Sequence, residues 1–466
     1  MRNNLNANKR NKSSKARIKT LKDDALSIFS LALPLIATQC IQSVTLLVNT
    51  FLMGQLGPKA LAGGALALSA FYMCYILAFG MVSATGNLVA ISYGAGRHQE
   101  VISTVRSGLL LSLLISLGMG ILLWHSTPLM LALGQDREII EVAQRFLRIL
   151  IWGIPFNLWF LTLRSFSAGL GKTRAILWLM LSSLLFSGGL GWLLSKSYGV
   201  YGIAMVSTFT YVYMSITFTC LIHFHPTYKR YPVFFNFSLS DVAILPSLLR
   251  IGSAWAGTLC LETSMLNICA WLIGALGAEA LAAHQSVMQL VITSFAVPNG
   301  LMYAVSILVG QAAGTENWYK VRSLLWTGGS ILLSLSLSII IILLLLSNQL
   351  LSLFFPDEIV STNEARNIAM KLMPLAALLC LLDGWQTFIS GILRALQDAK
   401  ITMLIHGISY WIVGIPIAWF LSEQGCGPIG IWWGMCIGFA IACVILQIRL
   451  GVCLHTLING SVKLMD

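Results

Sequence analysis

Long stretches without charge limit what this chain can fold into more than any other feature of its sequence. No Asp, Glu, Lys or Arg lies inside five runs, bounded by residues 24–59, 59–97, 106–136, 196–229 and 322–357. Each run exceeds the roughly 20 apolar residues that an α-helix needs to cross the hydrocarbon core of a bilayer. We therefore expect an all-α integral membrane protein. An outer-membrane barrel would instead alternate polar and apolar residues along its strands.

Composition and hydropathy agree with this class. Of the 466 residues 57% are hydrophobic and 10% charged, whereas a soluble domain has about 25% charged residues. Hydropathy predicts twelve spans, centred near residues 40, 76, 115, 155, 184, 211, 261, 295, 335, 380, 410 and 438. The first 22 residues lack the apolar core of a signal peptide. The ten Cys are scattered without a Cys-x-x-Cys pair, so we expect no metal centre and no cofactor.

The basic residues orient the chain. With an even number of spans both termini lie on one side, and 22 of the 29 Lys and Arg then share that side. By the positive-inside rule both termini are cytoplasmic, in a multi-pass protein of the bacterial inner membrane. The net charge of +12 is explained by this bias, so we expect no nucleic-acid partner.

The chain repeats itself. "MGQLGPKALAGGALAL" (53–68) aligns with "IGALGAEALAAHQSVM" (273–288) at an offset of 220 residues, after the first and seventh spans. Weaker echoes pair "SYGAGRHQE" with "LVGQAAGTEN", and "AGLGKTRA" with "RALQDAKI". Segments six spans apart have the same orientation, so the halves are parallel repeats related by an axis along the membrane normal. Such repeats suit alternating access, although channels have them too.

The repeat predicts a domain organisation with two lobes around a V-shaped central cleft. It comprises a basic tail (1–24), a six-helix N-lobe (25–224), a cytoplasmic linker (225–247), a six-helix C-lobe (248–452) and a C-terminal tail (453–466). We expect the protein to be a monomer whose other partner is the lipid bilayer.

Two acidic residues stand out among the seventeen. Glu262 and Asp383 alone lie mid-span, in spans 7 and 10, where a charge costs about 2.5–3.5 kcal/mol on insertion scales. Burial and a neighbouring carboxylate favour the protonated form of an acid, whereas a Na⁺ held by oxygens favours the ionised form. We therefore predict a cation-coupling site at Glu262 and Asp383 that takes H⁺ or Na⁺. The alternative is a pair of protonated acids with a purely structural role.

Other polar residues are weaker candidates for the pathway. Span 10 carries a polar stripe at helical spacing, from Asp383 through Gln386 and Thr387 toward its end. The remaining candidates are Asn49, Gln42, Thr263, Asn267 and Gln285. Asn49 is either a pathway residue or an interhelical hydrogen-bond partner, and for Gln285 a structural role is favoured over ion binding.

Signatures of enzymes and of nucleotide-driven pumps are missing. The sequence lacks Gly-x-Ser-x-Gly, His-Glu-x-x-His and the phosphate loop Gly-x-x-x-x-Gly-Lys-[Ser/Thr]. We expect no enzymatic activity. Transport would be driven by an ion gradient, or else be passive.

Six motifs, in order, resemble the multidrug and toxic compound extrusion (MATE) family, NorM-like branch, over about residues 26–450. They are "LALPLIATQCIQSVTLLVNTFLMGQLG", "GAGR", "LRSFSAGLGKT", "LETSMLN", "ALAAHQ" and "LLDGWQTFISGILRALQDAK". The resemblance implies export of bulky, often cationic, lipophilic compounds in exchange for Na⁺ or H⁺. It carries the family's span 7 glutamate onto Glu262 and its span 10 aspartate onto Asp383.

Departures from the family pattern concern mainly the first lobe. Asn49 stands where the family usually has an aspartate, and an amide does not titrate. Ser187 and Gly191 fall where the family has asparagines, and Leu379 replaces a tyrosine found in some relatives. An ion site in the first lobe is therefore not expected from these residues.

We predict a secondary-active multidrug antiporter for drug-like cations. Two alternatives stay open, a flippase for lipid-linked precursors and a passive channel. A flippase would need basic residues in its cavity, and the nearest, Arg145, Arg148 and Lys371, lie near span starts.

Overall fold

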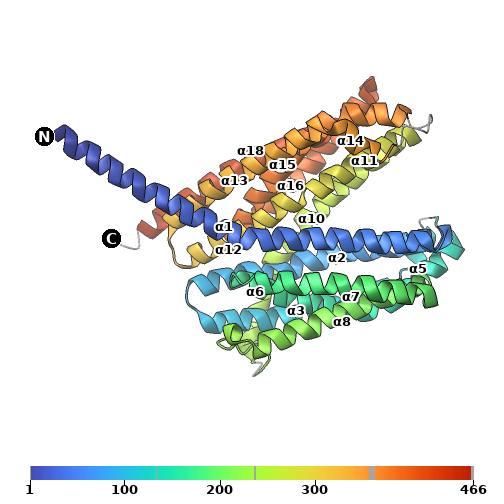
Figure 1. The fold of residues 1–466 in the computed structure, drawn as a ribbon, viewed down its shortest axis with the longest axis horizontal. Coiled ribbons are helices and arrows are strands. Elements are labelled where there is room, and N and C mark those ends of the chain that lie inside the picture. Colours follow the sequence, from blue (N-terminus) through green and yellow to red (C-terminus); the bar gives the residue numbers. More distant parts are fainter. Residues whose placement is uncertain (1, 133, 236–237, 356–362, 463–466) are drawn as a thin grey trace. The chain divides into compact units, whose positions relative to one another are not determined.

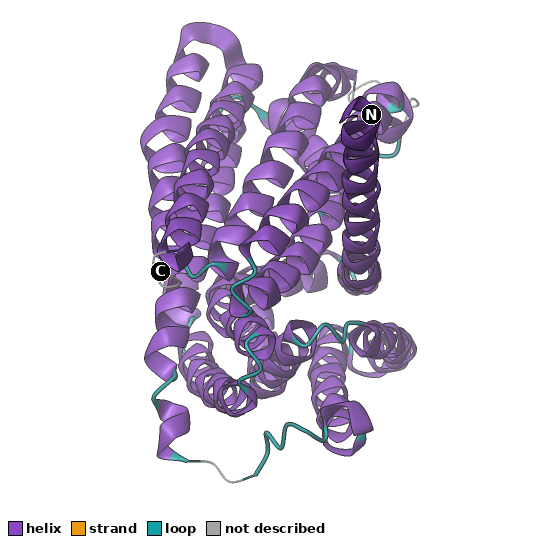
Figure 2. Cartoon of the chain, turned by 90° about the vertical axis from the view of Figure 1, so that its left-hand side faces the viewer, coloured by secondary structure: helices purple, strands orange, loops and turns teal. Residues whose placement is uncertain are grey.

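The computed structural model describes residues 2–132, 134–235, 238–355 and 363–462. In this part of the chain every regular element is helical and no strand occurs (Figures 1 and 2). The helices of the first half are α1 (Arg2–Gln55), α2 (Pro58–Gly94), α3 (His98–Trp124), α4 (Thr127–Ala132), α5 (Arg137–Leu150), α6 (Ile154–Gly169), α7 (Arg174–Tyr198), α8 (Val200–Phe224) and α9 (Leu239–Val242). Those of the second half are α10 (Leu245–Gly274), α11 (Ala278–Ser294), α12 (Ala296–Gly314), α13 (Trp318–Leu345), α14 (Ser347–Ser352), α15 (Asn363–Ala395), α16 (Ala399–Gly407), α17 (Ile415–Leu421) and α18 (Gly427–Val462).

Eleven helical segments of the described chain are long and apolar enough to cross a membrane. The last of them, Ala399–Asn459, has 61 residues, which is long enough for two crossings. Gly425 and Gly427 break it with φ values of 84° and 54°, which glycine adopts without a steric penalty. Beyond this break α18 packs back against α17. With this last segment divided at the glycines, the described residues offer the twelve candidate spans that hydropathy predicts.

The turns between helices reproduce the repeat in their backbone conformation. Gly57 precedes α2 with φ 101° and ψ 170°, and Gly277 precedes α11 with φ 128° and ψ 165°. These two glycines are 220 positions apart. Gly96 after α2 (φ 70°) corresponds at the same offset to Glu316 after α12 (φ 55°). The sequence echoes thus mark equivalent turns, even where the second repeat has lost its glycine.

Later turns match as well. Gly171 has φ 76° and its aligned partner Gln397 has φ 65°. Gly199, before α8, has φ 58° and ψ −137°, while Gly427, the first residue of α18, has φ 54° and ψ −141°. A left-handed residue costs little only as glycine or in a tightly determined turn. Matched positive φ values at four turns indicate that the two halves follow the same path from helix to helix.

The described chain divides into two compact units. Unit 1 comprises Met1–Ile36, Met265–Leu396 and Ile408–Asp466, and unit 2 comprises Ala37–Ser264 and Gln397–Gly407. The unit boundaries fall inside α1 and α10. Unit 1 therefore contains the first part of α1, the helix that begins the first repeat, and unit 2 contains the first part of α10, the helix that begins the second repeat. The lobes 25–224 and 248–452 describe the sequence repeat, and their independence as rigid bodies stays a prediction.

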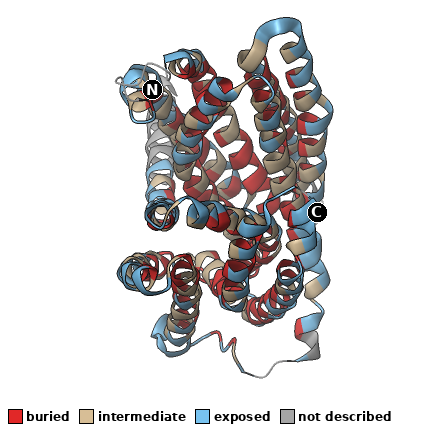
Figure 3. Ribbon diagram, turned by 90° about the vertical axis from the view of Figure 1, so that its right-hand side faces the viewer, coloured by how far each residue is buried: buried red, intermediate tan, exposed pale blue. Residues whose placement is uncertain are grey.

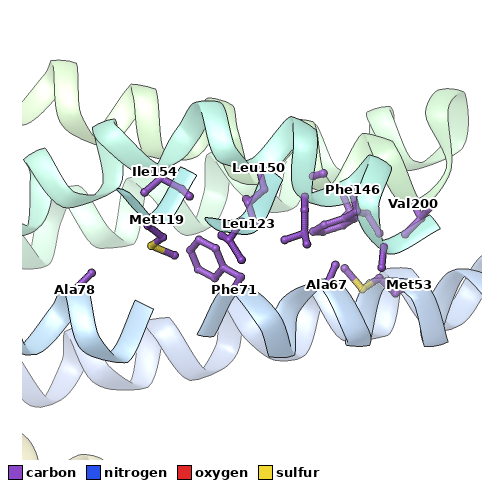
Figure 4. Close-up of a cluster of buried hydrophobic side chains, with 14 of the residues drawn as sticks. Met53, Ala67, Phe71, Ala78, Met119, Leu123, Phe146, Leu150, Ile154 and Val200 are labelled. Carbon is purple, nitrogen blue, oxygen red and sulfur yellow. The ribbon is translucent and has the colours of Figure 1, made fainter. Parts of the chain in front are cut away.

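The largest core cluster of unit 2 lies between α2, α3 and α5. Phe71 of α2 faces Leu123 of α3, and Phe146 and Leu150 of α5 complete the packing (Figure 4). These side chains are at most 2% exposed. Figure 3 shows exposed residues along the helices. Large apolar side chains are among the exposed residues of the chain, such as Trp178 at 69%. Apolar faces of this extent fit lipid as their surroundings.

Candidate ion site in the second repeat

Asp383 lies in α15 and is held by neighbours on its own helix. Gln386 Nε2 donates to Asp383 Oδ1 at 3.0 Å, and Thr387 Oγ1 donates to the same oxygen at 3.4 Å. Gln386 Nε2 is also 2.9 Å from Thr387 Oγ1. The spacing of three and four residues places all three groups on one helix face. The polar stripe of the sequence therefore orients the carboxylate.

A small cavity adjoins this carboxylate. Its volume is about 10 Å³, and Ser294, Pro298, Ser336 and Cys380 line it together with Asp383. That volume holds about one water-sized particle, whereas a drug-sized ligand needs roughly 300 Å³ or more. The cavity therefore suits an ion or a water molecule and excludes a drug.

Ser336 of α13 supplies the strongest local sign of an occupant. Its side chain is 3% exposed, and its Oγ has no hydrogen-bond partner among the described residues. A buried hydroxyl without a partner costs about 1–3 kcal/mol, so such groups normally bind water or an ion. Ser294 Oγ donates to the carbonyl of Leu290 at 2.8 Å and keeps its lone pairs for a further partner. A carboxylate and two hydroxyls are the oxygen ligands that hard cations prefer.

Sequence reasoning did not find Ser336 or Ser294. Ser336 stands in "SLSLS", where Ser334 and Ser338 donate to carbonyls of their own helix. Serine side chains in helices commonly donate a hydrogen bond to a backbone carbonyl of the same helix. Nothing in the sequence separates Ser336 from these neighbours, because only the packing of α13 against α15 turns it toward Asp383.

Glu262 is half-buried in α10, twelve residues before that helix ends at Gly274. It belongs to unit 2, whereas Asp383 belongs to unit 1. The proximity of the two carboxylates stays a prediction. Thr263 beside Glu262 is half-buried, and Asn267 is exposed.

Of the weaker candidates, the structure brings Gln386 and Thr387 into hydrogen-bond contact with Asp383. Asn49 is half-buried in α1, and Gln42 of the same helix is exposed. Gln285 is exposed on α11, while its neighbour His284 is 2% exposed and packs edge-on against Trp432.

Helices able to span a membrane, arranged in two repeats and carrying a half-buried acid beside an ion-sized cavity, have the architecture of a transporter. The MatE family matches residues 34–193 and 255–420, two stretches whose starts are 221 positions apart. This chain belongs to the MatE family, whose members are transporters rather than enzymes.

Relatives and solved structures agree with that assignment. A "Probable multidrug resistance protein NorM" of Pseudomonas putida is 34% identical, covering 90% of this chain and 92% of the relative. A protein of the same name from Synechococcus is 32% identical, covering 91% and 93%. The structure of a eukaryotic MATE transporter, AtDTX14, superposes with a TM-score of 0.84 at 20% identity, over 94% of this chain and 99% of that one. An outward-facing multidrug resistance MATE transporter matches with a TM-score of 0.84 at 19% identity, over 94% and 97%.

Proposed function

We propose that this protein is a secondary-active multidrug efflux antiporter that exports bulky, lipophilic cations in exchange for H⁺ or Na⁺. The NorM-named relatives support drug efflux. The observation that carries ion coupling is the cavity of about 10 Å³ between Asp383 and the partnerless hydroxyl of Ser336. A mid-span acid is expensive, and an exchangeable cation beside it accounts for its presence.

The geometry suggests how an ion changes the site. A proton on Asp383 removes the negative charge that Gln386 and Thr387 stabilise by hydrogen bonds. A Na⁺ would instead sit between Asp383 and Ser336 and leave those bonds intact. Either ion changes the interactions between α15 and α13, and neither ion needs to contact the drug.

Exchange follows from differential binding. Ion and substrate need only prefer opposite conformations of the transporter, and each then displaces the other across the membrane. In this proposal Glu262 is the second coupling carboxylate, and Asp383 carries the described ion cavity. Drug binding uses apolar and aromatic surface elsewhere, since planar cations gain attraction from aromatic faces.

Orientation completes the proposal. Both termini are cytoplasmic, in the inner membrane of a bacterium, because Lys and Arg concentrate on the side where the first span begins. Export then runs from the cytoplasm outward, and the coupling ion enters.

The two alternatives find less support. A flippase needs cations to hold lipid phosphates, and Arg145, Arg148 and Lys371 are exposed at their helix surfaces. Arg148 lies 5.2 Å from the ring centre of Trp124, which fixes it against its own neighbours. A passive channel has no use for a carboxylate beside a cavity the size of one ion.

Uphill transport in proteoliposomes tests the proposal. Vesicles receive either an inward Na⁺ gradient or an inward pH gradient, and movement of the cationic dye ethidium is followed against its own gradient. We expect one of the two gradients to concentrate the dye, and Glu262→Gln to abolish the effect. Dye movement that only ever runs downhill would identify a channel and refute antiport.

A further inference from the structure

A groove of about 490 Å³ lies between α13, α15 and α18, three helices of the second repeat (Figure 1). α13 and α18 each pack closely against α15 and touch each other little, so α15 forms the floor and the other two helices form the walls. Every lining residue belongs to unit 1. Most of the lining is apolar, and among the described residues that form it none is acidic. The apolar members include Leu325, Leu333, Phe388, Ile389, Leu450 and Leu454.

Two glycines give the groove its width. Gly329 stands on the α13 wall, where a Cβ would lie 3.5 Å from the ring of Trp385 on the floor. Gly451 stands on the α18 wall, and a Cβ there would meet no atom within 4 Å. A larger side chain at position 451 would therefore occupy the groove without displacing atoms of the protein.

The groove has the length of one bilayer leaflet. Eleven residues separate Arg322 from Leu333 on the α13 wall, which is about 16 Å at 1.5 Å per residue. That is about half of the roughly 30 Å hydrocarbon core. Trp385 at the inner end follows the mid-span acid Asp383 by two residues, and Arg322 at the other end follows the start of α13 at Trp318 by four. The groove therefore reaches from the middle of the bilayer to the surface where α13 begins.

One positively charged side chain stands at the surface end of the groove. Arg322 is exposed, and among the described residues it has no ion pair and no hydrogen-bond partner for its side chain. Lys320, two positions earlier, differs, because Lys320 and Ser323 both donate to the fully buried Asp24. The charge of Arg322 is thus available to a ligand in the groove, whereas that of Lys320 is neutralised inside the protein.

Aromatic side chains place Arg322 at the level of the lipid headgroups. Tyr319 and Trp326 lie three positions before and four positions after Arg322, on the same face of α13. Their side chains are 92% and 70% exposed. Trp and Tyr are enriched where a membrane meets water, and an arginine at such a depth extends its guanidinium toward the headgroups.

We propose that this groove binds one anionic phospholipid of the cytoplasmic leaflet, with an acyl chain along α15 and the headgroup phosphate against Arg322. Arginine binds phosphate through charge-assisted hydrogen bonds, and basic pockets between membrane helices hold anionic headgroups. A lipophilic cation would fit the apolar volume but would meet the charge of Arg322. The assignment to the cytoplasmic leaflet rests on the orientation proposed above, whereas the binding itself depends neither on that orientation nor on antiport.

Lipid titration followed by native mass spectrometry tests the charge contact. Phosphatidylglycerol or phosphatidylcholine is added to the full-length protein in detergent, and the fraction with one bound lipid is measured. The parent should bind phosphatidylglycerol more tightly than phosphatidylcholine. Arg322→Gln should weaken phosphatidylglycerol binding roughly fivefold, the scale of one basic residue near an anionic surface, and should leave phosphatidylcholine binding unchanged.

The matched control for the charge is Arg174→Gln. Arg174 is likewise an exposed arginine at the start of a helix, α7, and does not line the groove. Its substitution should change neither affinity. Equal affinities of the parent for the two lipids, or equal losses in the two variants, would overturn the proposal.

Filling the groove tests its location. Gly451→Leu should lower the affinity for both lipids several-fold, because the new side chain takes the place of an acyl chain. Gly189→Leu is the control, since Gly189 is an exposed glycine within α7 and a Cβ there also meets no atom within 4 Å. Thermal unfolding without added lipid checks that both variants are folded. Undiminished lipid binding by folded Gly451→Leu would place the lipid elsewhere and end the proposal.

Two competitors identify the chemistry of the occupant. Ethidium should not displace phosphatidylglycerol from the parent, and displacement would assign the groove to lipophilic cations instead. Glycerol phosphate carries the charge without the chains and should compete only at far higher concentration. If it competes as well as the lipid does, the site is an anion site without a chain groove, and the proposal is wrong. None of these measurements uses an ion gradient, so a failure of antiport leaves their outcome unaffected.

Discussion

Arg106 and Asp241 form a buried ion pair that fastens the segment between the two repeats to α3. Arg106 Nη1 lies 3.3 Å from Asp241 Oδ2, and both side chains are 5% exposed. Arg106 also donates to backbone carbonyls of the linker, at 3.3 Å to Val233 and 2.9 Å to Pro232. One side chain thus satisfies several linker carbonyls, and all of these residues belong to unit 2.

Loss of this pair should destabilise the protein. Arg106→Ala leaves Asp241 buried without its counter-charge, which costs about 3–5 kcal/mol. Thermal unfolding in detergent should show a clear drop in Tm. Arg97→Ala is the control, since the Arg97–Glu100 pair is about half exposed and worth about 0–1 kcal/mol. Equal effects of the two substitutions would contradict the structural role of Arg106.

Acid should weaken the ion pair between Arg106 and Asp241. Burial raises the pKa of Asp241, but hydrogen bonds from the Ser238 nitrogen and the Ser103 hydroxyl and the charge of Arg106 outweigh it and lower the pKa below its usual value of 3.8. The folded state therefore binds the proton less tightly than the unfolded state. Stability from this group is complete above about pH 4 and is lost as the pH falls through the lowered pKa.

Asp241→Asn should remove that part of the pH dependence. The variant should be less stable than the parent at pH 7, and the difference in Tm between the two proteins should become smaller toward pH 3. Melting temperatures across this range provide the measurement. A gap that widens on acidification would show that Asp241 is not stabilised as a carboxylate.

A turn residue offers a prediction about the repeat. Glu316 has φ 55° where the first repeat has Gly96 at φ 70°. The left-handed conformation costs a residue with a Cβ about 1–2 kcal/mol, so Glu316→Gly should raise Tm slightly. Gly96→Glu should lower it, and the opposite signs of the two changes are the check.

Ser336 distinguishes the two coupling ions. If Na⁺ binds between Asp383 and Ser336, Ser336→Ala removes an oxygen ligand and should raise the Na⁺ concentration needed for half-maximal efflux by roughly tenfold, the scale of losses at supporting ligands. Ser334→Ala is the control, because Ser334 bonds within its own helix. If efflux is driven by H⁺ alone, Ser336→Ala should leave its pH dependence in place. An unchanged Na⁺ requirement in a Na⁺-driven protein would exclude Ser336 as a ligand.

The sequence predicts the helices and the repeat well because both rest on local or periodic signals. Uncharged runs predict the spans, and the repeat offset of 220 residues predicts the matched turns at Gly57 and Gly277. Even the 61-residue last segment resolves into two predicted spans at its glycine break.

Long-range pairings could not be predicted in the same way. In the sequence Arg106 and Asp241 are two charges outside the middle of any span, and their pairing depends on how the linker returns to α3. Likewise Asp383 is conspicuous as a mid-span acid, whereas Ser336 becomes a candidate only through the packing of α13 against α15. The division of α10 between two compact units leaves no trace in its hydropathy.

Ion movement driven by substrate tests the central claim most directly. Proteoliposomes with equal Na⁺ and pH on both sides receive an ethidium gradient, and Na⁺ flux and internal pH are recorded together. The parent protein should move one of the two ions against the direction of the dye, and Asp383→Asn should abolish this flux. The exposed acid Glu423, changed to Gln, should leave it intact. Substrate-driven ion flux that persists in Asp383→Asn would contradict the account.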